Sequence, residues 1–256
     1  MKTEQFALHA KIEDTQWWFA GRRAIITSVV REITSGTTKG TIVDVGCGTG
    51  GNLSDLADDH NCVGIDSSGE AIEFAKKRLP DVRFICGDFP DDLDAIKDDA
   101  DVFMLLDVLE HIERDRESFH NLFGVVRDGG HVVLTVPALM SLWSPHDENY
   151  GHFRRYEPEQ LKTLWEGLPV TVRLFSFFNA YLYPVVNAVR AFNRWRGHEW
   201  GEAGTDLSIP PWPVNGLLTS FFAREARVLV DVLSGRRKKG FARGVSLMAV
   251  LRKEKG

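Results

Sequence analysis

Short apolar runs alternate along the chain with stretches in which apolar residues recur every three to four positions. The runs are rich in β-branched residues, as in 41–43, and such runs favour buried strands. They predict strands at 41–46, 62–66, 83–87, 101–106, 130–136, 170–176 and 244–253. Helical spacing predicts helices at 51–59, 69–78, 114–127 and 158–166. This alternation indicates βαβ units around a parallel sheet.

Helical patterns also occupy the first residues and much of the last third. Residues 1–34 are predicted to be helical and to be followed by a loop at 35–40. After Pro137 the simple alternation ends. Residues 139–170 are predicted to be an insertion, and 179–235 a mostly helical segment with a proline-rich break at 209–213.

A glycine-rich turn follows the first predicted strand. Gly46, Gly48 and Gly50 occupy alternate positions, and glycine lets a backbone turn tightly and approach a ligand. Asp44, Asp66 and Asp88 stand at the ends of three consecutive predicted strands. Because ligands of open α/β sheets bind beyond the carboxyl ends of the strands, we expect these acids to lie at one binding site.

The order acid-x-Gly-x-Gly-x-Gly resembles the first motif of the class I S-adenosylmethionine (SAM) methyltransferases. The resemblance covers about 41–138 and, less specifically, the last strand. It implies a Rossmann-like, doubly wound α/β fold whose seven strands have the order 3-2-1-4-5-7-6, with the last strand antiparallel. It implies one domain over 1–256, with an N-terminal helical segment at 1–40. It also implies substrate-side insertions at 139–170 and 179–243, which include a helical cap. The implied cofactor is SAM, and the implied product is S-adenosylhomocysteine.

The chemistry of SAM suggests a role for each acid. Asp66 can accept hydrogen bonds from both ribose hydroxyls, and Asp44 can pair with the cationic methionine end. Asp88 can accept from the adenine amino group, with Phe89 against the ring. Each acid could instead cap a helix. The expected cofactor-binding residues are Asp44, Gly46, Cys47, Gly48, Gly50, Asn52, Asp66, Ser67, Asp88, Phe89, Asp107 and Val108.

The glycine turn also permits a nicotinamide cofactor. Gly46, Gly48 and Gly51 satisfy the dinucleotide-binding pattern, and Asp66 follows at about 20 residues. Asp44 disfavours this interpretation, because a carboxylate repels a pyrophosphate and attracts a sulfonium or ammonium group. An NAD(P)-dependent oxidoreductase and a non-catalytic SAM-binding module remain the alternatives to a methyltransferase.

The segment 107–111, Asp-Val-Leu-Glu-His, is similar to the motif after the fourth strand in many small-molecule methyltransferases. Asp107, Glu110 and His111 also have the spacing of a metal site, as in the metal-dependent small-RNA 2′-O-methyltransferases and some ubiquinone O-methyltransferases. His146 or His152 would then be a further ligand. Such short sets often occur without metal, so we expect no metal and consider His111 a substrate-facing group or base.

The segment 141–156 concentrates polar and aromatic side chains after the fifth strand. A bacterial subgroup of these enzymes has a similar His-Asp…Gly-His-x-Arg-Arg-Tyr run, and also a Trp-Trp-Phe-x-Gly-Arg-Arg run like 17–23. The expected catalytic residues are His111, His146, His152 and Tyr156, and the expected substrate-binding residues are Arg154, Arg155, Trp18 and Arg23. In the alternative interpretation, the two arginines of the loop only form ion pairs with nearby carboxylates.

Composition narrows the setting. The formal charge of −5 gives no general attraction to nucleic acid. Three cysteines, an odd number, argue against a disulfide framework and suggest a reducing cytoplasm. The first residues lack the apolar region of a signal peptide. The most apolar stretch, 174–189, is interrupted by polar residues and shorter than the ~20 residues that a spanning helix needs.

These observations predict a cytoplasmic SAM-dependent methyltransferase that acts on a small or lipid-like, anionic acceptor, such as a prenyl diphosphate. The acceptor atom (oxygen, nitrogen or carbon) and the oligomeric state stay open. Aromatic residues at 174–195 and 209–222 indicate a helical cap with its own core, a greasy substrate pocket or a surface that rests on lipid. The basic run 236–239 would suit anionic lipid, although a solvated loop is the preferred interpretation.

Overall fold

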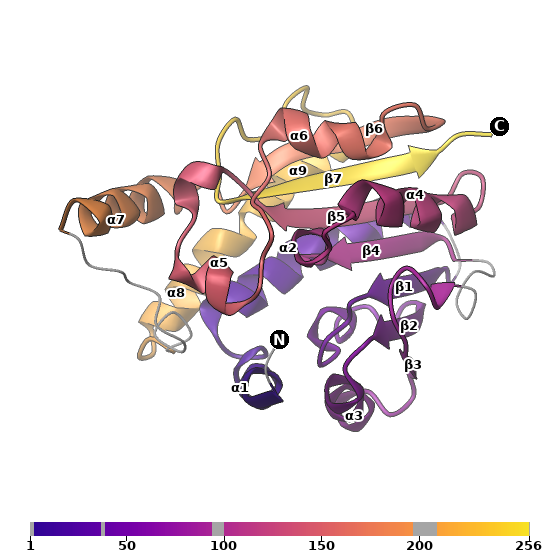
Figure 1. Ribbon diagram of the computed structural model, residues 1–256, viewed down its shortest axis with the longest axis horizontal. Helices are drawn as coiled ribbons and strands as arrows, with labels where there is room; N and C mark the ends of the chain where they lie inside the picture. The colour runs from indigo at the N-terminus through magenta and orange to yellow at the C-terminus, as the bar shows by residue number, and fades with distance from the viewer. Residues whose placement is uncertain (1–2, 37–38, 94–99, 197–208, 256) are drawn as a thin grey trace.

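The computed structural model describes residues 3–36, 39–93, 100–196 and 209–255. Its centre is a seven-stranded sheet of order β3-β2-β1-β4-β5-β7-β6 (Figure 1). The strands are β1 (Thr41–Val45), β2 (Asn61–Asp66), β3 (Arg83–Cys86), β4 (Val102–Leu106), β5 (His131–Pro137), β6 (Val170–Phe178) and β7 (Ser246–Lys253). β7 runs antiparallel to both of its neighbours, and β1 to β5 pair in parallel. The predicted fold and strand order are confirmed.

The central strand β4 shows why the sheet has two covered faces. All five of its residues are buried, as expected for a strand of a parallel sheet that has helices on both sides. Phe103 and Leu105 belong to one apolar cluster, whereas Met104 and Leu106 belong to another. Side chains alternate across a strand, so the two clusters lie on opposite faces of the sheet.

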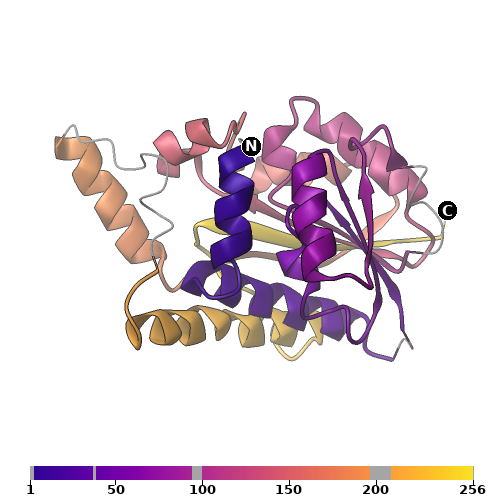
Figure 2. The same ribbon diagram turned by 90° about the horizontal axis from the view of Figure 1, so that it is seen from below.

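Helices cover both faces (Figure 2). On one side lie α2 (Trp17–Ile33), α8 (Val214–Ala223) and α9 (Glu225–Leu233), and α2 packs against the other two. On the other side, α4 (Asp115–Val125) packs against the short 3₁₀ helix η5 (Thr163–Trp165), which continues α6 (Pro158–Lys162). The remaining helices are α1 (Thr3–Ile12), α3 (Gly69–Arg78), α5 (Pro145–Asn149) and α7 (Tyr183–Arg196).

The caps of α3 explain why its bounds match the predicted helix at 69–78. The Ser68 hydroxyl accepts a hydrogen bond from the Ala71 N–H at 3.2 Å, which satisfies one free donor of the first turn. Glu70 lies in the first turn, and Lys76, Lys77 and Arg78 lie in the last, where each charge complements the helix dipole.

The predicted helix at 51–59 is wrong. Only the 3₁₀ helix η1 (Gly51–Leu53) forms there, and turns follow it. Gly51 offers little helix propensity, and a Cβ at its position would lie 2.5 Å from a carboxylate oxygen of Glu13. The predicted helix at 158–166 is divided into α6 and η5, and the insertion also contains α5, which the pattern did not predict.

The segment 179–235 is mostly helical as predicted, with α7, α8 and α9, although 197–208 lie outside the described residues. None of the described helices is long and apolar enough to cross a membrane. Figure 1 shows the arrowheads of β4 and β5 pointing toward the end of the molecule where α5, α7 and α8 lie. The carboxyl ends of the parallel strands therefore face the inserted segments.

Candidate functional site

The glycine turn after β1 keeps one position open to a ligand. Gly46, Gly48 and Gly50 all have positive φ angles, of 71°, 54° and 82°. A Cβ on Gly46 would lie 2.7 Å from the Val108 side chain, so this part of the turn is closed by the end of β4. A Cβ on Gly48 would meet no atom of the described residues within 4 Å, apart from those of its two neighbours in the chain. The backbone at Gly48 can therefore be approached closely from outside.

Asp66, at the end of β2, holds this turn. Its Oδ2 accepts a hydrogen bond from the Gly48 N–H at 2.8 Å, and its Oδ1 accepts one from the Ser68 N–H at 2.8 Å. A carboxylate oxygen can accept more than one hydrogen bond, so acceptor capacity remains for hydroxyl groups. Its expected contact with ribose stays a prediction. Of the other expected cofactor residues here, Cys47 is buried and Ser67 is exposed.

Asp44 is a fully buried carboxylate near the end of β1. Its side chain is fully buried, and neither oxygen has a hydrogen-bond partner among the described residues. Burial raises the pKa of Asp44 to about 7, and the nearby Arg22 only partly opposes this rise. A buried charge without a partner is costly, so a cationic group fits this position. The ammonium group of a methionine moiety has this charge.

Arg22 connects three segments beneath the site. From α2, its guanidinium pairs with Asp107 Oδ2 at 2.8 Å, donates to Thr135 Oγ1 at 3.0 Å and donates to Asn52 Oδ1 at 3.3 Å. It also lies 5.5 Å from the ring centroid of Trp18. Arg22 was not among the residues expected from the sequence. Its spacing from the buried apolar residues at 25, 26 and 29 places it on the inward face of α2 and could have identified it.

The neighbouring Arg23 has a different environment. Its guanidinium lies 3.2 Å from Asp55 Oδ2 and 3.4 Å from Asp14 Oδ1, and it donates to the Glu13 carbonyl oxygen at 3.1 Å. These contacts brace α2 against the segment that follows the glycine turn. Substrate binding by Arg23 and Trp18 stays a prediction.

Asp107 is held in an uncommon backbone conformation at the end of β4. Its φ is 60°, in the left-handed region that non-glycine residues seldom adopt. Besides the Arg22 pair, its Oδ1 accepts a hydrogen bond from Thr135 Oγ1 at 3.1 Å. These two partners fix the carboxylate, and Val108 follows against Gly46. The end of β4 thus forms one wall of the glycine turn.

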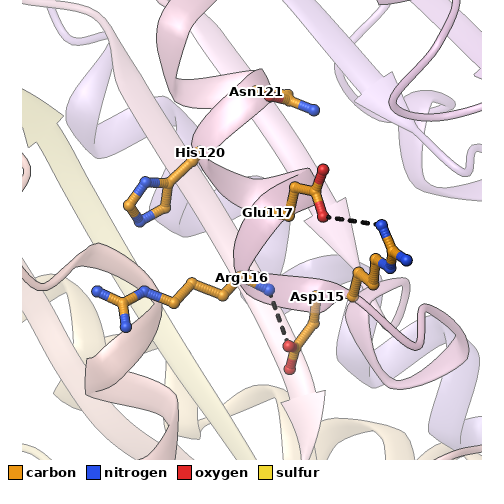
Figure 3. Close-up of a pocket in the computed structure, with 6 residues that line it drawn as sticks. Asp115, Arg116, Glu117, His120 and Asn121 are labelled. Atoms are coloured by element: carbon orange, nitrogen blue, oxygen red, sulfur yellow. Dashed lines mark hydrogen bonds and ion pairs between the residues drawn. The ribbon is translucent and has the colours of Figure 1, made fainter.

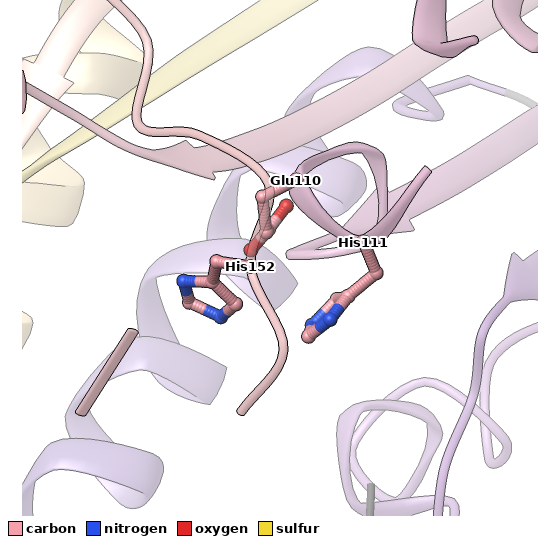
Figure 4. A group of neighbouring side chains, drawn as sticks. All are labelled: Glu110, His111 and His152. Carbon is pink, nitrogen blue, oxygen red and sulfur yellow. The ribbon is translucent and has the colours of Figure 1, made fainter. Parts of the chain in front are cut away.

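Glu110, His111 and His152 form a compact cluster next to this wall (Figure 4). Glu110 and His111 belong to the 3₁₀ helix η3 (Leu109–His111), and His152 to the loop after α5. One carboxylate oxygen of Glu110 and one ring nitrogen of each histidine all lie within 4.8 Å of one another. The centroids of the two imidazole rings are 4.7 Å apart. This spacing would suit either proton exchange or a small cation. Asp107 is not in the cluster.

The electrostatics of the cluster are unusual. Glu110 is fully buried, and neither carboxylate oxygen has a hydrogen-bond partner among the described residues. Burial, together with Asp107, raises the pKa of Glu110 well above its usual range. Desolvation and the nearby His152 lower the pKa of His111 to about 4, although its side chain is exposed overall and solvent limits this decrease.

Asp147 orients His152 from the other side. His152 Nδ1 lies 2.9 Å from Asp147 Oδ1, and Arg155 Nε lies 2.8 Å from the same oxygen. Asp147 Oδ2 accepts from the Ser144 N–H at 2.9 Å, which forms the cap of α5. Although burial alone would raise it, these partners hold the pKa of Asp147 well below its usual range. A proton on His152 Nδ1 leaves Nε2 as the accepting atom.

The arginines and the tyrosine of this loop are engaged with protein groups. Arg155 is buried and pairs with Asp147, whereas Arg154 pairs with Asp115 Oδ2 at 2.7 Å. The Tyr156 hydroxyl donates to the same Asp115 oxygen at 2.6 Å, and burial raises the pKa of Tyr156. Substrate contact by the arginines and catalysis by Tyr156 stay predictions. The ion-paired loop that we considered as the alternative is present, with Asp115 as the unexpected partner of Arg154.

His146 lies in an aromatic group that joins the loop to α1. Its ring stacks on Tyr150 at 4.4 Å between centroids and lies 6.4 Å from His152. The Tyr150 hydroxyl is 3.1 Å from His9 Nε2. Burial and His146 lower the pKa of His9 to about 4. The sequence analysis missed His9 and Tyr150, which lie far apart along the chain.

The third acid of the series lies outside these contacts. Asp88 is exposed, and its N–H donates to Asp92 Oδ2 at 2.8 Å. Phe89 is partly buried against the core. Their expected place beside adenine stays a prediction.

A separate surface hollow on α4 is lined by Arg114, Asp115, Arg116, Glu117, His120 and Asn121, and Figure 3 shows these side chains along the outside of the helix.

Comparison with known proteins supports the interpretation of this site. A family described as a methyltransferase domain matches residues 42–130, which contain the glycine turn, Asp66 and η3. No curated protein matches the sequence.

Several solved structures have a similar fold. The plantazolicin methyltransferase BpumL in complex with S-adenosylhomocysteine superposes with a TM-score of 0.58 at 17% identity, over 98% of this chain and 90% of that one. A chain of the complex between the Haloferax volcanii Trm112 methyltransferase activator and a putative methyltransferase gives 0.57 at 17% identity, over 99% and 96%. Haemonchus contortus phosphoethanolamine N-methyltransferase 2 in complex with SAM gives 0.52 at 14% identity, over 90% and 52%.

At these identities the structural likeness shows the fold, which is the Rossmann-like fold of class I methyltransferases. The domain match adds the chemistry, and together they indicate SAM as the methyl donor. The buried Asp44, whose oxygens have no hydrogen-bond partner in the described parts of the chain, and the open backbone at Gly48 fit a cationic donor that lies against the turn.

Proposed function

We propose that this chain transfers the methyl group of SAM to a hydroxyl or amine group of a small or lipid-like acceptor. The observation that carries the proposal is the Asp147–His152 pair, which lies against η3, directly after the Val108 side chain that contacts the glycine turn. When a hydroxyl or amine group is methylated, it must lose a proton. The imidazole of His152, oriented by Asp147, can accept that proton.

The donor side uses the first two acids. Asp44 would pair with the cationic methionine end, and Asp66 would accept from the ribose hydroxyls while it holds Gly48. SAM, when bound, supplies an activated methyl group on a positively charged sulfur. Arg22 positions this side of the site indirectly, because it fixes both Asn52 and Asp107.

The acceptor side uses the histidine cluster. His152 would accept the acceptor proton at Nε2, since Nδ1 faces Asp147. Glu110, buried beside the two imidazoles, favours protons or positive charge in the same space. The remaining work of the protein is to place the acceptor atom in line with the methyl group and to exclude water.

The nature of the acceptor is inferred from the side chains around this cluster. They are imidazoles and carboxylates, and the two nearby arginines are paired with Asp115 and Asp147. This composition favours an acceptor whose reacting group carries a proton. The anionic acceptor predicted from Arg154 and Arg155 requires that one of these pairs opens to receive it.

Donor binding tests the proposal directly. Asp66→Ala should weaken SAM binding, measured by calorimetry, by about 1.5–3 kcal/mol, because hydrogen bonds to a charged group are lost. Asp58→Ala removes an exposed carboxylate elsewhere and serves as the matched control. NAD should not raise the unfolding temperature, whereas SAM should. Stabilisation by NAD alone, or unchanged SAM affinity in a folded Asp66→Ala variant, would contradict the donor assignment.

A turnover assay tests whether the chain transfers the methyl group to an acceptor. Incubation with radiolabelled SAM and either a membrane lipid extract or an aqueous metabolite extract should label a product in one of the two, and should not do so in a His152→Ala variant. A protein that binds SAM tightly but labels neither extract would instead be the non-catalytic binding module.

A further inference from the structure

Helix α8 presents an apolar face to solvent. Its inward face packs on α2 through the fully buried Phe222, and the Asn215 side chain accepts from the Trp17 N–H at 2.9 Å. On its outward side, Val214, Leu217 and Phe221 are 46%, 67% and 41% exposed. Their spacing of three and four residues places them on one side of the helix. No charged residue occurs from 209 to 223.

The exposed apolar surface continues beyond α8. Trp212, just before the helix, is 88% exposed, and the Tyr181 ring lies 5.1 Å from that of Phe221. On α7, Val185 and Val189 are exposed and one helical turn apart. We call this surface the α7–α8 apolar face, made of Tyr181, Val185, Val189, Trp212, Val214, Leu217 and Phe221. Figure 2 shows both helices at the same end of the molecule.

This surface is larger than isolated apolar side chains would explain. Among the large apolar side chains that are exposed in the described parts of the chain, those that do not belong to this face are Met140, Phe153, Val172 and Ile209. Scattered exposed apolar residues are ordinary, but exposed apolar residues that recur along one side of a helix mark a surface that another body covers.

The charge of the surroundings indicates what that body is. Residues 171–256 contain 14 Lys and Arg against 6 Asp and Glu, whereas residues 1–170 contain 17 against 30. Arg224 and Arg227, directly after α8, are exposed and have no ion-pair partner among the described residues. The α7 sequence contains three arginines and no acid. An apolar face within cationic surroundings complements a surface that is both apolar and anionic.

We propose that the α7–α8 apolar face rests on the surface of an anionic lipid bilayer. The apolar side chains enter the boundary between headgroups and acyl chains, with Trp212 among them, and Arg224 and Arg227 contact lipid phosphates. A second copy of the chain would bring positive charge against positive charge. Contact with a bilayer also places lipid next to the end of the sheet where the parallel strands terminate.

Vesicle sedimentation with the full chain tests this inference. Binding to vesicles of phosphatidylcholine and phosphatidylglycerol should exceed binding to phosphatidylcholine alone by at least about fivefold, as expected for even one basic contact. Leu217→Glu should lower the partition coefficient at least about tenfold, whereas the same change at the exposed Val172, in β6, should not. Arg224→Gln should weaken binding to the anionic vesicles more than Lys77→Gln, which removes one charge from α3.

Each alternative has its own outcome. Equal binding of wild type and Leu217→Glu, or no binding to either vesicle, would overturn the inference. A dimer in light scattering that Leu217→Glu dissociates would make the face a contact between copies instead. If Leu217→Glu does not fold, Trp212→Ser replaces it, because a side chain that is 88% exposed has no core contacts to lose. The assay needs neither SAM nor acceptor, so its failure leaves the methyl-transfer proposal intact.

Discussion

Nδ1 of His152 lies 2.9 Å from Oδ1 of Asp147, a fully buried carboxylate. This contact fixes the orientation of the imidazole and determines which ring nitrogen faces the neighbouring His111. A carboxylate in this position also stabilises the protonated imidazole that forms when the acceptor loses its proton.

Asp147→Asn should therefore lower methyl transfer by about 10²-fold with little change in SAM affinity. Turnover with the active extract and calorimetry with SAM provide the two measurements. Glu148→Gln, on the exposed side of the same helix, is the control. Equal loss in both variants, or a parallel loss of SAM affinity in Asp147→Asn, would reduce Asp147 to a structural role.

Asp44 should make stability depend on pH. Its pKa is about 7 in the folded protein and near 3.8 ordinarily, so the folded state binds more protons between these values. The free energy of unfolding contributed by this group therefore falls as pH rises through the interval. From about pH 5 to pH 8, urea unfolding should show Asp44→Asn gaining about 2–3 kcal/mol relative to wild type. Asp58→Asn should show no such trend. A constant difference between Asp44→Asn and wild type would contradict the assignment.

Substitution of Arg154 should affect activity, whereas substitution of Arg155 should affect both activity and stability. Arg154→Ala should lower kcat/KM for the true acceptor by at least about tenfold, or ~1.4 kcal/mol, if its guanidinium leaves Asp115 to bind an anionic group. Arg155→Ala should lower activity too, but should also destabilise the fold by about 3–5 kcal/mol because it removes a partner of the buried Asp147. Wild-type kinetics in Arg154→Ala, with Arg116→Ala as control, would exclude the anionic acceptor contact.

Chelation should leave activity unchanged. Asp107, one of the three residues with metal-site spacing, is occupied by Arg22 and Thr135, so the expected ligand set is incomplete at that position. Turnover after EDTA treatment and dialysis should equal that of untreated protein. Loss of turnover that Mg²⁺, Mn²⁺ or Zn²⁺ restores would instead assign an ion to Glu110, His111 and His152, whose donor atoms lie within 4.8 Å of one another.

The strands could be predicted from the sequence because burial on both sheet faces leaves continuous apolar runs. For β4 the predicted and observed ranges differ by one residue, 101–106 against Val102–Leu106. The segment after Gly50 could not be predicted in this way. Its apolar spacing is helical, but the glycines and the nearby Glu13 allow only one short 3₁₀ turn, and that tertiary contact is invisible in a local pattern.

The site shows the same division. That Asp44, Gly48 and Asp66 lie close together could be predicted, because the two acids end neighbouring strands and the glycines follow the first acid at fixed spacing. Whether Arg22 or Arg23 points toward the site depends on which face of α2 turns inward, and Arg22 lies on the buried face. The pairing of Asp147 with His152 depended on how the insertion folds back over η3, where the Phe153 N–H donates to the Glu110 carbonyl oxygen at 2.8 Å. Such contacts are set by the whole insertion and not by its local sequence.

The antiparallel β7 has a consequence for how the chain is made. It lies between β5 and β6, yet β6 ends at Phe178 and β7 begins at Ser246. During synthesis on the ribosome, β6 therefore has no place in the sheet until the polypeptide has emerged through Lys253. Up to that moment β5 keeps an unpaired edge that other nascent chains can join. Chaperone engagement late in translation would protect this edge.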